Sequence, residues 1–344
     1  MAFEENKYNA WERNEINQNS KGGTETVMEG IIQRVEEEAP GLLQDFQIIA
    51  SRVRQIKEDK IRIYHLHDLP EDPETNHLKQ ESSRDRFHKL VFCGHWQYNQ
   101  FITKLNIPQD DKSVVIETPI DPIPFIEKPK DDINLIYTST PQRGLELLYP
   151  VFEKLCEKYD NIYLHVFSSF KIYGWEDADK KYQTLFDKLE AHPKIIYHGF
   201  KSNEEVRTQL QQSHIFAFPS IWSECNSRSL IEAMSAGLMC VHPNLAGLSD
   251  TSGGLTFQYQ FDQNVNKHAN KFYHALDHAI EVVNQPEMQQ YFKFVKAYAD
   301  SRFNWKKIIG QWQDTLNALK FGYPSQQSRS LKKDEGPMFH YVVK

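Results

Sequence analysis

Short apolar runs and longer amphipathic stretches alternate along almost the whole chain of 344 residues. Apolar runs of strand length lie at 46–50, 61–66, 90–93 and 114–117, and again at 133–138, 162–168, 195–197, 215–218 and 239–241. Apolar residues with helical spacing lie before or between them, at 27–37, 96–105, 145–159, 181–191 and 204–212. Strands that alternate with helices favour parallel sheets with helices on both faces. The pattern therefore predicts an α/β fold.

A proline-rich stretch divides this pattern in two. The segment PIDPIPFIEKPKDD has prolines at 119, 122, 124 and 129, and proline at that density prevents a regular helix or strand. We therefore place a boundary near residue 125, with a first domain at 1–125 and a second at 126–302. The tail at 321–344 is polar, with the charged stretch RSLKKDEG, and is predicted to be loosely ordered.

The segment from 214 to 250 combines two strands, a helix and two acidic side chains. A strand at 215–218 is followed by a loop that carries Glu224. Asn226 and Ser227 are residue types that cap helices, so a helix is expected to start there. Glu232 then lies about a turn and a half into that helix. The segment reads as a βαβ unit with one carboxylate before the helix and one within it.

This arrangement suits a ligand with a phosphate in the middle and hydroxyl groups at both ends. A helix N-terminus offers backbone N–H groups and a partial positive charge to phosphate, whereas carboxylates accept hydrogen bonds from sugar hydroxyls. Glu224 and Glu232 are therefore candidates for holding a sugar and a ribose on either side of a diphosphate. The simpler alternative is a surface ion pair between Glu232 and Arg228, four residues apart, with Glu224 as a solvated loop residue.

The same segment resembles the retaining glycosyltransferases with two Rossmann-like domains, the GT-B fold, in the group 1 or family 4-like class. Their signature P-S-x(3–4)-E-x7-E-A-x-A-x-G matches Pro219, Ser220, Glu224, Glu232, Ala233, Ala236 and Gly237. The resemblance implies that Glu224 contacts the donor sugar, that Glu232 binds the ribose and that amides between them hold the diphosphate. It also implies that a final helix, at about 303–320, crosses back to the first domain. The family normally opens with a hydrophobic strand, whereas residues 1–20 are strongly polar, so the order of the first strands is left open.

Other candidate residues surround the expected cleft. Gly22 and Gly23 precede a helix, and two glycines let a backbone approach a ligand closely. The resemblance places such a loop against the donor phosphates or the acceptor. Arg143 follows the strand at 133–138, at the start of a helix, where a cation is unfavourable unless an anion lies between them. The resemblance implies two basic residues on the diphosphate, with Arg143 as the second, and it implies that Phe200 lies where the base is held. Thr138 occupies the first basic position, so that contact is either missing or supplied from elsewhere, with Arg228 as the candidate.

Histidines of the first domain are further candidates. His65 and His67 alternate along a strand, so both rings lie on one face, a spacing that suits a metal. No third ligand is visible in the sequence, and we assign no metal site. The resemblance makes His67 the candidate that approaches the donor sugar or the acceptor, with Asp68 to orient it; His95 is a second choice.

Composition narrows the class of protein. The chain is 40% hydrophobic and 25% charged, typical of a globular protein, and its net charge of −7 argues against nucleic acid as the main partner. Its four cysteines match no zinc pattern and suggest no disulfide framework. With no signal-peptide pattern and no long apolar run, a cytoplasmic location is expected. Relatives that act on lipid-linked acceptors leave room for weak peripheral membrane contact, although no strongly basic amphipathic helix is visible.

The sequence is thus expected to encode a retaining glycosyltransferase that moves a sugar from a nucleoside-diphosphate sugar to a hydroxyl acceptor on a glycan, lipid-linked glycan or protein glycan. The resemblance implies no obligatory metal or other cofactor, and a UDP-sugar is slightly favoured as donor. The catalytic candidates are Glu224, His67 and Arg143. Two alternatives stay open: a nucleotide-sugar epimerase of the same architecture, and a non-catalytic sugar- or nucleotide-binding protein.

Overall fold

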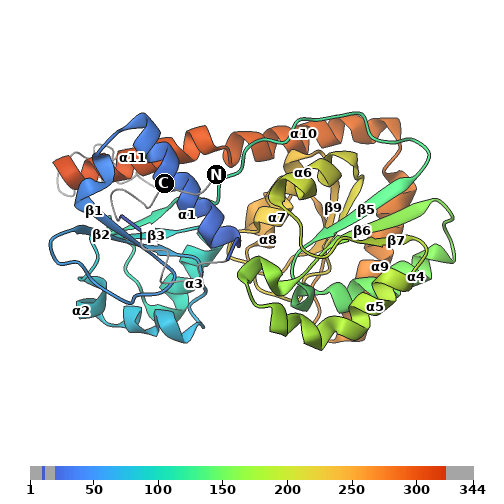
Figure 1. The fold of residues 1–344 in the computed structure, drawn as a ribbon, viewed down its shortest axis with the longest axis horizontal. Coiled ribbons are helices and arrows are strands. Elements are labelled where there is room, and N and C mark those ends of the chain that lie inside the picture. The colour runs from blue at the N-terminus through green and yellow to red at the C-terminus, as the bar shows by residue number, and fades with distance from the viewer. Residues whose placement is uncertain (1–9, 12–19, 323–344) are drawn as a thin grey trace, which may run out of the picture.

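The computed structural model describes residues 10–11 and 20–322, which form two lobes side by side (Figure 1). The first lobe contains a four-stranded sheet of order β1-β2-β3-β4, and the second a six-stranded sheet of order β10-β9-β8-β5-β6-β7. All pairings within both sheets are parallel. The prediction of an α/β chain with two Rossmann-like domains is confirmed.

The strands of the first sheet are β1 (Phe46–Ala50), β2 (Ile61–Leu66), β3 (Lys89–Phe92) and β4 (Ser113–Val115). Those of the second are β5 (Ile133–Thr138), β6 (Ile162–Phe167), β7 (Ile195–Tyr197), β8 (Ile215–Ala217), β9 (Met239–Pro243) and β10 (Phe257–Tyr259). Most lie within two residues of the apolar runs that predict them. The exception is β10, a three-residue strand at the sheet edge whose length gives almost no periodic signal.

Helices cover both sheets. Those of the first lobe are α1 (Gly23–Glu38), α2 (Glu81–Arg84) and α3 (His95–Leu105). Those that follow are α4 (Leu145–Cys156), α5 (Gln183–Ala191), α6 (Asn203–Gln212), α7 (Arg228–Ser235), α8 (Leu248–Ser252), α9 (Val265–Val282), α10 (Pro286–Arg302) and α11 (Trp305–Phe321). In Figure 1, α10 runs along the second lobe and α11 continues onto the first.

The core of the first lobe explains where α11 belongs. Trp312, Ile308 and Ile309 of α11 are buried in one apolar cluster with residues of α1 and of strand β1. The C-terminal helix is therefore part of the first lobe's core, although the six-stranded sheet lies between them in the sequence. Ala10 also reaches this lobe, where its carbonyl accepts a hydrogen bond from the Ile48 N–H at 2.7 Å.

The chain passes between the lobes twice, near Ile120 and near Phe303, and these two crossings lie next to each other. The N–H of Ile120 donates to the Phe303 carbonyl at 2.8 Å, and Ile120 pairs with Asn304 in a parallel bridge. The proline-rich linker that follows Ile120 is hydrogen-bonded to the second lobe. Three of its backbone carbonyls accept hydrogen bonds from side chains of the second lobe. Arg207 donates to the Asp121 carbonyl, Lys296 to the Ile123 carbonyl and Gln211 to the Pro124 carbonyl. The chain therefore passes between the lobes at Ile120, a few residues before the proposed boundary at 125.

In the part of the chain that the structure describes, no helix combines the length and apolar character needed to span a bilayer. Most of the predicted tail, from residue 323 on, lies outside the described residues.

Candidate functional site

The second sheet has a topological switch point beside its central strand. Strand β5 has β8 on one side and β6 on the other, so the loops that leave β5 and β8 turn towards opposite faces of the sheet. In open parallel sheets, ligands bind at the carboxyl ends of the strands at such a point. The loop after β5 carries Arg143, and the loop after β8 carries Glu224.

Close backbone packing fixes these two loops relative to each other. Gly144 has φ +118°, and a Cβ added to it would lie 2.2 Å from the carbonyl oxygen of Pro219. The residue after Arg143 must therefore be glycine for the loop to approach Pro219 this closely. The guanidinium of Arg143 then lies beside the carboxylate of Glu224, with 3.2 Å between Nη1 and Oε1.

The Glu224 side chain is held inside the site. The residue is only 9% exposed, and its backbone carbonyl accepts a hydrogen bond from the Gly247 N–H at 2.9 Å. A Cβ on Gly247 would lie 2.6 Å from that carbonyl oxygen, so the loop after β9 also supports Glu224. Burial alone lowers the pKa of Arg143. The negative charge of Glu224 and other neighbouring groups together raise it by more than burial lowers it, so the guanidinium stays charged and its pKa lies above the ordinary value.

The helix α7 begins just after Glu224, without the predicted caps. Ser227 occupies the N-cap position, but its own side chain makes no capping hydrogen bond, and its N–H donates to Thr251 Oγ1 at 3.4 Å. Asn226 instead joins the two lobes: its Oδ1 accepts from the Thr118 N–H and its Nδ2 donates to Thr251 Oγ1, both at 3.3 Å. The assignment of Asn226 and Ser227 as capping side chains is therefore wrong. An uncapped helix N-terminus is open to an anion.

Glu232 is part of a polar cluster and not of a surface ion pair. It is 5% exposed, and its Oε1 lies 3.2 Å from Arg228 Nη2 and 3.7 Å from Arg207 Nη1. Asn203 Nδ2 donates a hydrogen bond to the same oxygen at 3.3 Å. The ion pair with Arg228 that the simpler alternative describes is therefore present, but it is buried and shared with Arg207 and Asn203. The pairing also shows that Arg228 is engaged with Glu232.

Several buried polar atoms around the switch point have no hydrogen-bond partner within the described residues. They come from the loop after β5, the end of β6, the loop after β8 and the start of α7. The atoms are Thr138 Oγ1, Ser139 Oγ, Thr140 Oγ1, Gln142 Oε1, Arg143 Nε, Ser168 Oγ and Arg228 Nε; Glu224 Oε1 also has no hydrogen bond, although Arg143 Nη1 lies 3.2 Å away as its ion-pair partner. Buried polar groups are normally paired, because leaving one unpaired costs about 1–3 kcal/mol. Their gathering at one place indicates a site for a polar ligand.

The glycine loop of the first lobe reaches this site from across the cleft. The Lys21 N–H donates to the Ile172 carbonyl at 2.7 Å, and a Cβ on Gly22 would lie 2.7 Å from the ring of Tyr173. Tyr173 in turn lies with its hydroxyl 3.5 Å from Arg143 Nη2. Gly22 therefore packs against the loop after β6 and lies near Arg143, whereas a Cβ on Gly23 would meet open space.

His67 lies at the end of β2, in contact with the second lobe. Its backbone carbonyl accepts a hydrogen bond from Cys225 Sγ at 3.3 Å. Cys225 directly follows Glu224 in the sequence. Its Nε2 faces His65 Nδ1 at 3.2 Å and its Nδ1 faces Cys93 Sγ at 3.7 Å, so neither nitrogen faces Asp68. The expected orienting role of Asp68 is not seen. Burial lowers the pKa of His67 to about 4, which keeps its ring neutral near pH 7.

Cys93 supplies the third candidate metal ligand that the sequence did not reveal. One potential ligand atom from each of His65, His67 and Cys93 lies within 4.8 Å of the others. The two nitrogens of His67 face different partners, and Cys93 Sγ donates to the Leu66 carbonyl at 2.8 Å. These contacts hold the three side chains together, and the assignment of no metal site stays a prediction.

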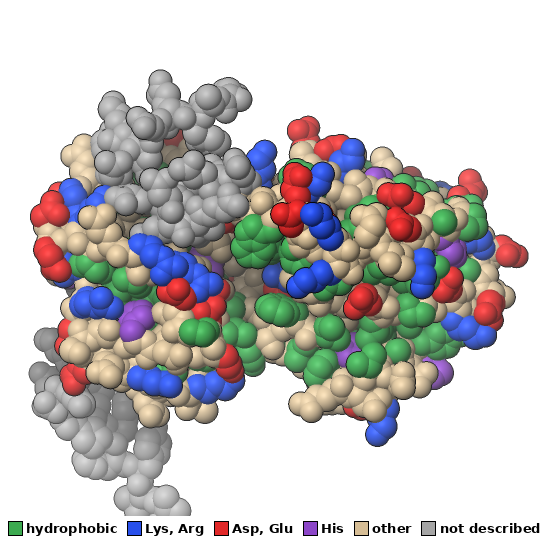
Figure 2. Space-filling model, turned by 60° about the horizontal axis from the view of Figure 1, so that its bottom comes forward, with side chains coloured by type: hydrophobic (Ala, Val, Ile, Leu, Met, Phe, Trp, Pro, Cys, Tyr) green, Lys and Arg blue, Asp and Glu red, His purple; other side chains and the backbone are tan. Residues whose placement is uncertain are grey.

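Apolar and aromatic side chains lie at the edge of the site. Trp222 is 50% exposed two residues before Glu224. Phe200, after β7, lines a surface pocket of about 650 Å³ together with Tyr197 and with mostly charged side chains such as Lys171, Asp179 and Glu190. Figure 2 shows the surface hollowed between the two lobes, with hydrophobic side chains on both sides of the hollow.

Comparison with known proteins agrees with this geometry. Residues 122–280 match the model of the family described as glycosyl transferases group 1. This segment is therefore similar to the group 1 glycosyltransferases. It contains the whole loop–helix unit from Glu224 to Glu232 and the loop of Arg143. No curated protein matches the chain.

Solved glycosyltransferases share the fold. A glycosyltransferase from Rickettsia africae is 14% identical with a TM-score of 0.64, over 90% of this chain and 85% of that one. Sucrose-phosphate synthase from Thermosynechococcus elongatus is 13% identical with a TM-score of 0.60, over 87% and 79%. Anabaena HepE, solved with UDP and glucose, is 15% identical with a TM-score of 0.58, over 75% and 72%. The two-lobed fold that contains the matched segment is therefore GT-B.

Some residues of the site carry no signal in the sequence. Arg207 and Asn203 lie on α6 and reach Glu232 only through the packing of α6 against α7. Asp250 bridges the lobes, because its carboxylate accepts from the Trp96 N–H at 2.9 Å and lies 3.2 Å from Arg302 Nη2. Such contacts join segments far apart in the chain, so no local motif reveals them.

Proposed function

We propose that this protein is a retaining glycosyltransferase, which transfers a sugar from a nucleoside-diphosphate sugar to a hydroxyl group of a glycan, lipid-linked or protein-linked acceptor. The group of unpaired buried polar atoms at the switch point carries this proposal. It lies between two acidic side chains, Glu224 and Glu232, and beside a helix N-terminus whose N-cap residue, Ser227, makes no side-chain capping hydrogen bond. A diphosphate with a hydroxyl-rich group at each end matches such a site in charge and in hydrogen bonding.

Each group then has a part in the reaction. Glu232 holds the ribose, and Glu224 holds the hydroxyls of the donor sugar beside Arg143. The diphosphate lies on the backbone amides at the start of α7, near Ser227 and Arg228, with Arg143 in contact. As the bond to the sugar breaks, negative charge grows on the leaving phosphate, and fixed donors aimed at that charge lower the barrier.

The donor base and the acceptor occupy the two remaining sides. Phe200 and the pocket after β7 face the base, and HepE, which shares this fold, was solved with UDP, so a uridine nucleotide is the first to test. Gly22 and His67 of the first lobe close the cleft from the acceptor side. Arg143 and the helix amides neutralise the diphosphate, so we propose transfer without an obligatory metal, and EDTA should leave the rate unchanged.

The experiment starts from nucleotide binding, because the donor class can be fixed without knowing the acceptor. Thermal unfolding is followed with UDP, GDP and ADP, and the best nucleotide is titrated by calorimetry. The proposal expects one clear preference, weaker nucleotide binding in Glu232→Ala, and near-normal binding with lost transfer in Glu224→Ala. Full activity in both variants would contradict the roles given to these acids.

Product analysis separates the alternatives. NMR of the products made from an α-linked donor should show an α-linked product, or α-linked free sugar at early times if water is the acceptor. An isomerised nucleotide-sugar without transfer would identify an epimerase instead. Nucleotide binding without turnover of any donor would identify a binding protein.

A further inference from the structure

We propose that Arg207 is a positioning residue that couples the ribose-binding Glu232 to the linker between the lobes; this inference rests on the proposed function. Arg207 lies on α6, and its two terminal nitrogens face different partners. Nη1 lies 3.7 Å from Glu232 Oε1, whereas Nη2 donates to the carbonyls of Asp121 at 2.8 Å and Pro122 at 3.3 Å. One guanidinium therefore touches both the site and the linker.

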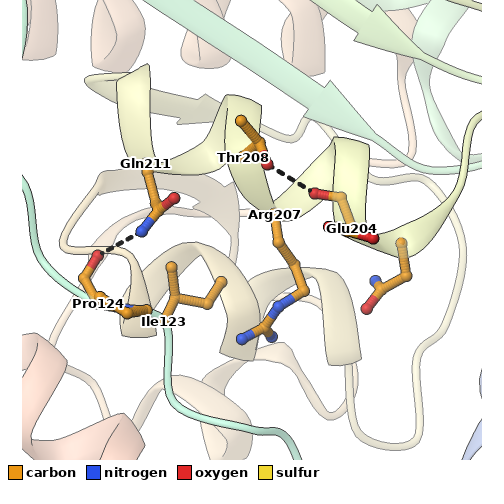
Figure 3. A pocket seen from close by; sticks show the side chains of 7 residues that line it. Ile123, Pro124, Glu204, Arg207, Thr208 and Gln211 are labelled. Carbon is orange, nitrogen blue, oxygen red and sulfur yellow. Dashed lines mark hydrogen bonds between the residues drawn. The ribbon is translucent and has the colours of Figure 1, made fainter.

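The contact with the linker lies close to the crossing between the lobes. Asp121 directly follows Ile120, the residue that pairs with Asn304 where the two chain segments cross. Figure 3 shows Arg207 extending from α6 towards this part of the chain, beside Ile123 and Pro124. A shift of the Arg207 side chain must therefore move, or release, the carbonyls nearest the crossing.

The contacts continue from the linker into the first lobe. The carboxylate of Asp121 lies 3.2 Å from Nη2 of Arg34, which is on α1 and whose guanidinium stacks over Trp305 at 4.2 Å. Helix α1 begins at Gly23, in the glycine loop that faces the cleft. A continuous set of contacts thus runs from Glu232 through Arg207 and Asp121 to the helix that carries this loop.

The Glu232 end of this set can respond to a ligand. Glu232 is shared by Arg228, Asn203 and Arg207, and the Arg207 contact is the longest of the three. Ribose hydroxyls that bind the carboxylate must reorganise these partners, because a carboxylate has a limited number of acceptor sites. Arginine suits the linking position, since its fork donates in two directions at once, whereas the ammonium of lysine is a single point charge.

Two substitutions on α6 separate this role from simple support. Arg207→Lys keeps a positive charge near Glu232 but cannot reach both partners. Gln211→Ala, one turn further on, removes the 3.0 Å hydrogen bond to the Pro124 carbonyl without touching Glu232. Hydrogen exchange is measured for both variants and the wild type, with and without saturating nucleotide, using whichever of UDP, GDP and ADP binds best.

In the wild type, nucleotide should slow exchange both in peptides of the site, around 220–235, and in the linker, around 117–124. In Arg207→Lys the site should still be protected while the linker is not, and Gln211→Ala should behave as the wild type. Transfer assays should then show a kcat about tenfold lower in Arg207→Lys than in the wild type, which lies at the low end of the range for coupling between two sites. The affinity for the donor should change by less than about threefold.

The possible failures are distinct. Site protection without linker protection in the wild type, or equal linker protection in Arg207→Lys, would overturn the coupling and leave the proposed function intact. Absence of nucleotide protection anywhere, together with no calorimetric binding, would overturn both.

Discussion

Gly144 offers a direct test of how the site is assembled, because a methyl group there meets two separate penalties. Its φ of +118° is unfavourable for any other residue, and the added Cβ would lie 2.2 Å from the Pro219 carbonyl oxygen. The torsional penalty is roughly 1–3 kcal/mol, and forcing backbone apart in a packed region adds roughly 1–3 kcal/mol. Gly144→Ala should therefore lower the free energy of unfolding by about 2–6 kcal/mol.

Two other glycines separate these terms. Gly254 has φ +73° but open space around its Cβ, so Gly254→Ala meets only the torsional penalty. Gly247 lies outside the positive-φ region, but its Cβ would be 2.3 Å from the Cys225 carbonyl oxygen, so Gly247→Ala meets only the clash. Each should cost less than Gly144→Ala, roughly 1–3 kcal/mol.

The assay is urea unfolding followed by circular dichroism, with transfer activity measured in the same preparations. Gly144→Ala should also reduce transfer strongly, because it displaces Arg143 from Glu224, whereas Gly254→Ala should keep its activity. If Gly144→Ala were no more destabilising than Gly254→Ala, the close approach of the loop to Pro219 would not be a constraint, and our account of how Arg143 is placed would fail.

Three further predictions concern the same chain. Glu224→Gln removes the carboxylate beside the largely buried Arg143, so stability should fall by about 1–3 kcal/mol in urea unfolding, and unchanged stability would show that solvent already screens the pair. Burial lowers the pKa of His242 to about 4, so below pH 6.5 the unfolded chain binds a proton that the folded chain excludes. The free energy of unfolding should thus fall between pH 6.5 and 4, by at most about 3 kcal/mol for this residue, and His242→Asn should flatten that slope; an unchanged slope would contradict this. Trp312→Ala should cost about 3–5 kcal/mol and disrupt the first lobe, seen as a lower melting temperature, and a change below 1 kcal/mol would show that α11 does not complete that core.

The strands and most helices up to residue 243 could be predicted from the sequence, because most of them have a strong local period, whereas α9 and α10 were not predicted. The strand at 215–217 and the helix at 228–235 are short, but they lie between turn residues and carry the spaced acids. The β10 strand could not be found, because three residues give no measurable alternation. The order of the first strands, which the sequence leaves open, is β1-β2-β3-β4 within the described residues, which exclude 1–9 and 12–19.

The site could be predicted only where its residues are close in sequence. Glu224 and Glu232 share one loop–helix unit, and a fixed spacing ties both to the carboxyl edge of the sheet. Whether Glu232 was buried or exposed depended on α6, which brings Arg207 against it from another part of the chain. Likewise, the amide-binding role of Asn226 became visible only when the other lobe placed Thr118 beside it. Local pattern gives the candidate groups, and tertiary packing decides their partners.

The position of α11 has a consequence for how the molecule is made. All strands of the six-stranded sheet are synthesised before Trp312, which is buried in the core of the four-stranded lobe. The lobe that is translated first must therefore wait, with part of its apolar surface uncovered, while the lobe translated second can already fold. A nascent chain stalled before residue 305 would expose that surface to chaperones or aggregation, and trimming α11 would damage the half of the protein farthest from it in sequence.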